Sequence, residues 1–131
     1  MPKTVLLIDD DRRLILVYAE AITEQGMKSH CMHGPDDALA YLKAGNPADV
    51  IVWDMMMLPG KAFADMDTEG GTSTGRFLYE SMRQLRPDAA FILLTNQLFD
   101  EEFVERPAER SYGRAKQDTA PDDLALFIKN L

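Results

Sequence analysis

Four carboxylates in the sequence come directly after runs of aliphatic residues. The stretch LLIDDDRR places Asp9, Asp10 and Asp11 after the apolar residues 5–8, and the stretch DVIVWD ends in Asp54. Continuous aliphatic runs of this length are typical of strands that are buried on both faces of a parallel sheet. Because ligands of open α/β sheets bind at the carboxyl ends of the strands, acids there can hold a metal ion or react. The first three acids also fit the start of a helix, since carboxylates favour the positive end of the helix dipole.

Two further polar residues end strand-like segments. The stretch AAFILLT closes on Thr95, and a weaker strand pattern over residues 111–116 closes on Lys116. If the strands are parallel, both side chains emerge at the same edge of the sheet as the acids. Clustered carboxylates repel one another, and Mg²⁺ relieves such repulsion because it binds one or two carboxylates together with a phosphate. A carboxylate can also become an aspartyl phosphate, whose oxygens an ammonium and a hydroxyl group stabilise.

The elements that position these residues alternate between two periodicities. Period-two or fully apolar runs predict strands over residues 4–9, 27–32, 49–54, 89–95 and 111–116. Apolar residues at helical spacing predict helices around residues 14–22, 34–45, 78–85, 98–106 and 124–131. Thr74 is expected to cap the third of these helices, and Pro107 to end the fourth. Five strands that alternate with five helices predict one domain over residues 1–131, an α/β fold with a parallel sheet and helices on both faces. Residues 55–74 lack periodicity and are rich in glycine, so they predict a long loop of the kind that usually has a function.

Composition limits the classes of partner. The formal net charge is −8, from 22 acidic and 14 basic residues. This balance argues against direct binding to nucleic acid or to an anionic membrane, and favours a divalent cation or a basic partner. The sequence has a single cysteine, Cys31, and no leader pattern, which predicts a cytoplasmic protein without disulfides. No apolar segment approaches the roughly 18 residues that a membrane-spanning helix needs.

The motifs LLIDDD, IVWDMMMLPG, ILLTN and AKQ, in this order and at these strand ends, resemble the receiver domain of bacterial two-component response regulators. The resemblance covers essentially the whole chain and implies the flavodoxin-like, doubly wound sheet of five strands and five helices. It implies a signalling switch rather than an enzyme, in which Asp54 accepts a phosphoryl group from a sensor histidine kinase or a phosphotransfer protein. Self-catalysed phosphotransfer and autodephosphorylation belong to such a switch. Output then comes from contact with a downstream protein target or from a homodimer.

The resemblance also implies a role for each site residue. The Mg²⁺ ligands are Asp10, Asp54 and the backbone carbonyl of Met56, and Asp9 acts mainly through a water bound to the metal. Thr95 binds the phosphoryl group and moves on activation, and Lys116 pairs with the phosphoryl group.

The sequence departs from the receiver pattern at several positions near the site. One extra residue separates Asp54 from the proline that follows it, and the loop after it is unusually long. The usual Lys-Pro is Lys116-Gln117, and its peptide bond is predicted to be trans because a cis bond before a residue other than proline costs roughly 2.5–4 kcal/mol. Asn96 is larger than the small residue expected after the threonine, and Tyr112 lies about one place away from the usual aromatic position.

Two other functions fit parts of the pattern. The Asp-x-Asp of Asp9 and Asp11 resembles the haloacid dehalogenase phosphatases, in which Asp9 is the nucleophile and Asp11 the general acid, but this interpretation leaves Asp54 without a role. The substitutions Asn96 and Gln117 suggest a degenerate receiver that binds partners without being phosphorylated. The presence of the complete set of acids, hydroxyl and ammonium argues against that alternative.

Overall fold

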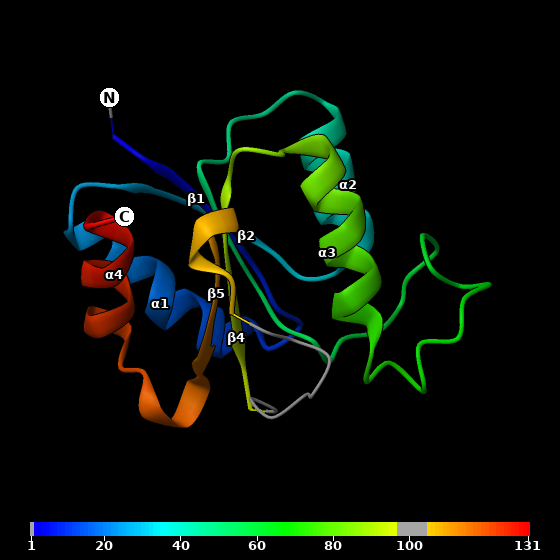
Figure 1. Ribbon diagram of the computed structural model, residues 1–131. Coiled ribbons are helices and arrows are strands. Elements are labelled where there is room, and N and C mark those ends of the chain that lie inside the picture. The colour runs from blue at the N-terminus through cyan, green and yellow to red at the C-terminus, as the bar shows by residue number, and fades with distance from the viewer. Residues whose placement is uncertain (1, 97–104) are drawn as a thin grey trace.

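The computed structural model describes residues 2–96 and 105–131 (Figure 1). Its strands are β1 (Thr4–Ile8), β2 (Lys28–Met32), β3 (Val50–Trp53), β4 (Ala90–Thr95) and β5 (Ser111–Ala115). Its α-helices are α1 (Arg12–Glu24), α2 (Pro35–Lys43), α3 (Thr74–Leu85) and α4 (Pro121–Lys129). Two short 3-10 helices, η1 (Pro107–Glu109) and η2 (Lys116–Asp118), flank β5.

All five strands pair in parallel, in the order β2-β1-β3-β4-β5. This is the strand order of flavodoxin-like sheets, so the predicted fold class is confirmed. The helices α1 and α4 cover one face of the sheet, and α2 and α3 cover the other (Figure 1). Each face therefore has its own apolar core.

Side chains point alternately to the two faces of each strand, so the strands contribute to both apolar cores. In β1, Val5 and Leu7 pack towards α1 and α4, whereas Leu6 and Ile8 pack towards α2 and α3. All four are at most 1% exposed, and full burial of an aliphatic side chain is worth about 1.5–3 kcal/mol. The central strands need apolar residues on both faces, which is why the sequence shows unbroken aliphatic runs there.

Two of the predicted boundaries need correction. Most of the helix predicted over residues 98–106 lies outside the described residues, and residues 105 and 106 are not helical. Pro107, which was expected to end that helix, instead opens η1. Among the residues that the structure describes there are thus four α-helices rather than five. The N-cap of α3 is Ser73, and Thr74 lies inside its first turn.

The long loop between β3 and α3 is packed against the helices beside it. The carboxylate of Asp36, in the first turn of α2, accepts hydrogen bonds from the backbone N–H groups of Lys61 and Ala62, both at 2.8 Å. Phe63 is 6% exposed, and its ring centroid lies 6.1 Å from that of Phe77 in α3. The loop therefore has a defined path over α2 and α3, although it contains no strand or helix of its own.

Across the described part of the chain, no helix has both the length and the apolar character required to cross a bilayer.

Candidate functional site

The first two acidic side chains of the site meet where the strand order of the sheet reverses. β1 and β3 are neighbours and pair Ile8 with Trp53, and each strand is followed directly by an aspartate. Asp9 and Asp54 therefore leave the sheet side by side, and each is only 6% exposed. The sequence predicted that both would lie at the carboxyl edge of the sheet, and the structure places them there.

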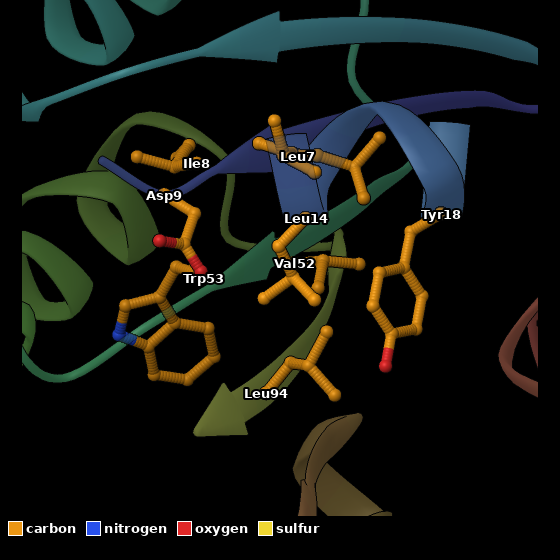
Figure 2. Close-up of a pocket in the computed structure, with 9 residues that line it drawn as sticks. Leu7, Ile8, Asp9, Leu14, Tyr18, Val52, Trp53 and Leu94 are labelled. Carbon is orange, nitrogen blue, oxygen red and sulfur yellow. The ribbon is translucent and has the colours of Figure 1, made fainter. Parts of the chain in front are cut away.

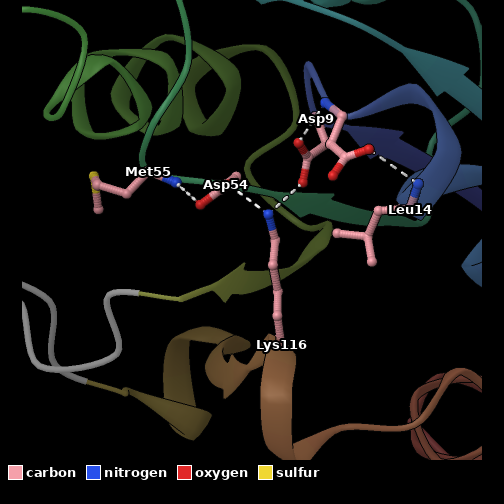
Figure 3. Close-up of polar contacts among 6 residues, drawn as sticks. Asp9, Leu14, Asp54, Met55 and Lys116 are labelled. Carbon is pink, nitrogen blue, oxygen red and sulfur yellow. Dashed lines mark hydrogen bonds and ion pairs between the residues drawn. The ribbon is translucent and has the colours of Figure 1, made fainter.

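Lys116 joins the two carboxylates (Figure 3). Its Nζ lies 2.7 Å from Oδ2 of Asp54 and 2.8 Å from Oδ2 of Asp9. The other carboxylate oxygens accept backbone hydrogen bonds, Oδ1 of Asp54 from the N–H of Met55 at 2.7 Å and Oδ1 of Asp9 from the N–H of Asp11 at 2.9 Å. Each carboxylate is thus held by one backbone N–H group and by the Lys116 ammonium.

Burial and charge compete at these groups. Burial raises the pKa of Asp9, and the hydrogen bonds from Lys116 and from the Asp11 N–H only partly oppose that effect. For Lys116, burial acts to lower the pKa, but the hydrogen bonds and charges of Asp54 and Asp9 outweigh it and raise the pKa. The lysine therefore remains an ammonium ion at neutral pH.

Thr95 lies at the same edge, at the end of β4. Its side chain is buried, and the register pairs it with Ala115, the residue before Lys116. On the other side of β4, Leu93 pairs with Trp53, so the end of β4 lies between the strands that carry Asp54 and Lys116. The register thus brings the hydroxyl-bearing residue to the strand between the acid and the lysine.

The remaining predicted site residues lie on the rim. Asp10 is exposed, and Met56 is 42% exposed in the loop that follows Asp54. Asp11 is the N-cap of α1, and its Oδ1 accepts a hydrogen bond from the N–H of Leu14 at 3.2 Å. For Asp11, the helix start is therefore the correct interpretation.

The donor set at this edge fits a small, hard cation. Asp9 and Asp54 both lie within hydrogen-bond distance of one ammonium, so a single cation already bridges their carboxylates. Carboxylate oxygens are the ligands that Mg²⁺ prefers. Within residues 2–96 and 105–131, however, no three His, Cys, Asp or Glu side chains are gathered as a complete metal site. Ligands beyond these two carboxylates would have to come from the rim, from backbone carbonyls or from water.

The sequence matches no protein-family model and no curated protein. Solved structures match it along nearly its full length. A CheY-like response regulator receiver domain protein from Methanospirillum hungatei JF-1 is 20% identical, with 99% of this chain and 93% of that chain covered and a TM-score of 0.76. This chain has the receiver fold.

Two further structures with this fold have ligands or partners. A response regulator solved in complex with a histidine kinase is 21% identical, with 98% of this chain and 97% of that chain covered and a TM-score of 0.69. A response regulator from Burkholderia pseudomallei, solved with a phosphorylated aspartic acid, a calcium ion and citrate, is 19% identical, with 98% and 71% covered and a TM-score of 0.60. At these identities the likeness establishes the fold.

Sequence reasoning missed how this receiver fold fixes the backbone beside Asp54. The Trp53 indole Nε1 donates a buried hydrogen bond to the carbonyl of Gly75 at 3.0 Å, and the Gly75 N–H donates to the carbonyl of Met55 at 2.8 Å. A Cβ atom at Gly75 would lie 2.5 Å from the Cα of Met55. In the sequence, this close approach was indicated only by Gly75 itself, because glycine is an unfavourable residue in a helix.

Tyr112 shows the consequence of its shifted position in this receiver fold. Its ring packs edge to face against Phe127 of α4, with centroids 5.3 Å apart. The Arg114 guanidinium covers the Phe127 ring, 4.4 Å from its centroid. Gly113 lies between them, three residues before Lys116. The aromatic side chain of β5 is therefore packed towards α4, because residues two apart on a strand share one face.

Proposed function

We propose that this protein is a phosphorylation-controlled switch in which Asp54 accepts a phosphoryl group from a phosphohistidine. The observation that carries the proposal is the placement of the Lys116 ammonium between Asp54 and Asp9 at the carboxyl edge of a receiver fold. A carboxylate can act as a covalent nucleophile, and an ammonium beside it neutralises charge on the phosphoryl oxygens that it receives. The kinase complex and the phosphorylated aspartate of the two neighbours described above support the same chemistry.

In the proposed reaction, a carboxylate oxygen of Asp54 forms a bond to phosphorus while the bond from phosphorus to the imidazole nitrogen breaks. The imidazole leaves with the electron pair of that bond, and an acyl phosphate remains on Asp54. The Met55 N–H holds the carboxylate in one orientation during attack. Lys116 then neutralises charge on the phosphoryl oxygens, and the Thr95 hydroxyl donates a hydrogen bond to one of them.

Asp9, Asp10, Asp54 and the carbonyl of Met56 are the groups that we propose for Mg²⁺, with Asp9 acting mainly through a bound water. The bound ion supplies charge neutralisation for the phosphoryl oxygens. Asp9 has a second task in this scheme, because its carboxylate helps to hold the Lys116 ammonium beside Asp54.

The partners follow from the same chemistry. A sensor histidine kinase or a phosphotransfer protein is the phosphodonor, and the output is contact with a downstream protein or with a second copy of this chain. The net charge of −8 favours a donor with a basic surface around its histidine.

The proposal is tested by intact-protein mass after incubation with acetyl phosphate, with and without Mg²⁺. Wild type is compared with Asp54→Asn, Asp9→Asn and Asp88→Asn, the last being an exposed acid at the opposite end of β4. We expect a single phosphoryl adduct that needs Mg²⁺, disappears in Asp54→Asn and persists in Asp88→Asn.

The other outcomes each contradict the proposal. An adduct that persists in Asp54→Asn but is lost in Asp9→Asn would favour the phosphatase alternative. If neither acetyl phosphate nor a phosphorylated histidine kinase gives an adduct on any variant, the protein is a receiver that binds partners without phosphorylation.

A further inference from the structure

The turn that carries Lys116 has little packing of its own. η2 contains no buried residue, and its peptide bonds, like all those of the described chain, are not cis. The Thr119 N–H makes a long hydrogen bond of 3.5 Å to the carbonyl of Lys116, which closes the turn. Yet the ammonium at the end of this side chain reaches past β4 to two carboxylates. A contact from outside η2 must therefore hold this turn in place.

Tyr18 makes that contact. It lies on α1, is 3% exposed, and its hydroxyl donates a hydrogen bond of 2.7 Å to the carbonyl of Thr119. Figure 2 shows the ring pointing away from α1, and Tyr18 and Asp9 line one small cavity together with Leu14 and Val52. A rigid aromatic ring in a helix thus places one donor at the residue that follows η2.

We propose that Tyr18 is a positioning residue for Lys116, because its hydroxyl fixes the turn that holds the ammonium between Asp9 and Asp54. The inference rests on the proposed function only where it concerns phosphoryl transfer. The chain of contacts runs from the α1 core through Tyr18 and Thr119 to Lys116. Loss of the hydroxyl would release the turn while leaving the ring and the core in place.

The charges around Tyr18 agree with this role. Burial raises the pKa of its phenol, and the nearby Lys116 charge acts in the opposite direction, so the hydroxyl remains protonated and the two groups lie within electrostatic reach. Lys116 is itself paired with Asp9 and Asp54. The phenol therefore acts as a neutral donor to a carbonyl.

Tyr41 offers a matched control. It lies in α2, and its hydroxyl donates to the carbonyl of Pro47 at 2.7 Å, a bond of the same length between the same groups but more exposed to solvent. Tyr41→Phe and Tyr18→Phe each remove one hydroxyl and keep the ring. Any difference between the two variants at Lys116 then comes from the position of Tyr18, not from the loss of a tyrosine hydroxyl.

The first measurement is the NMR signal of the Lys116 ammonium in unphosphorylated protein, assigned by its absence in Lys116→Ala. The second is the rate of phosphorylation by acetyl phosphate with Mg²⁺. For Tyr18→Phe we expect a displaced or broadened Lys116 signal and a rate about fivefold lower, the equivalent of one neutral hydrogen bond. For Tyr41→Phe we expect both to equal the wild type.

The proposal is wrong if Tyr18→Phe leaves the Lys116 signal unchanged, whatever its effect on thermal stability. In that case the hydroxyl only supports the fold. If wild type accepts no phosphoryl group, the proposed function fails, but the Lys116 signal still decides the role of Tyr18. The two proposals therefore fail by different observations.

Discussion

Alanine at position 75 should destabilise the protein, although the same change stabilises most helices. Gly75 lies in the first turn of α3, where its backbone contacts the residues that follow β3. A Cβ atom there would lie 2.5 Å from the Cα of Met55 and 3.0 Å from its carbonyl oxygen. Carbon atoms in contact prefer about 3.5–4.0 Å, so α3 must move away from Met55 by roughly 1 Å.

The cost follows from what that movement disturbs. It stretches two hydrogen bonds, from the Gly75 N–H to Met55 and from Trp53 to the Gly75 carbonyl, each worth about 1 kcal/mol. Overpacking adds about 2 kcal/mol. Alanine forms helices better than glycine, and this offsets about 1 kcal/mol of the loss in the free energy of unfolding. We therefore expect Gly75→Ala to lower the free energy of unfolding by about 3 kcal/mol.

The assay is urea unfolding followed by far-UV circular dichroism, with Gly34→Ala as the control. Gly34 is the extended N-cap of α2, and no described heavy atom outside its chain neighbours lies within 4 Å of a Cβ built there. Gly34→Ala should cost at most about 1 kcal/mol, because alanine is a weaker N-cap. Phosphorylation of Asp54 by acetyl phosphate should also slow in Gly75→Ala, since the backbone beside the acid shifts.

If Gly75→Ala is as stable as wild type or more stable, the close approach of α3 to Met55 does not constrain the site. The reasoning would also be refuted by an equal loss of stability in Gly34→Ala, because that would indicate a general effect of replacing glycine.

Three other substitutions test the electrostatics. Because burial raises the pKa of Asp9, its contribution to stability is fully present below pH 3.8 and is lost as the pH rises through the folded pKa. At pH 7 without Mg²⁺, Asp9→Asn should thus raise the free energy of unfolding by about 1 kcal/mol in urea titrations, and the gain should shrink towards pH 4. Lys116→Ala leaves two buried acids without their cation, so it should lower the free energy of unfolding by about 3 kcal/mol in the same titration. Lys61 is exposed, and the control Lys61→Ala should change the free energy of unfolding little. Asp36→Ala removes the acceptor of two loop amides, and hydrogen exchange at Lys61 should accelerate while exchange in the strands stays unchanged.

The parts of the fold that the sequence predicted are those with strong local patterns. β1, β3 and β4 are unbroken aliphatic runs, and the polar residue that ends each run marks the edge where Asp9, Asp54 and Thr95 lie. Pro107 was misread because proline both ends a helix and favours the first turn of one. Local sequence does not distinguish these two uses.

The parts that sequence reasoning missed depend on contacts between distant residues. Trp53 and Gly75 are 22 residues apart, and Tyr18 and Thr119 are 101 apart. A buried indole or phenol needs a hydrogen-bond partner, but its identity is set by packing that only the folded chain defines. The predicted trans bond after Lys116 is confirmed, whereas the roles assigned to the site residues stay predictions.

A backbone hydrogen bond joins the two ends of the long loop after β3. The Met57 N–H donates to the carbonyl of Gly71 at 3.1 Å, so the two ends of the excursion are already joined before it extends over α2 and α3. Lengthening a loop whose ends are fixed costs little entropy, since the cost grows only with the logarithm of its length. The exposed residues 64–67 within it are therefore a place where evolution or an engineer can insert further chain, giving the protein a new partner surface while the acid beside the loop keeps its place.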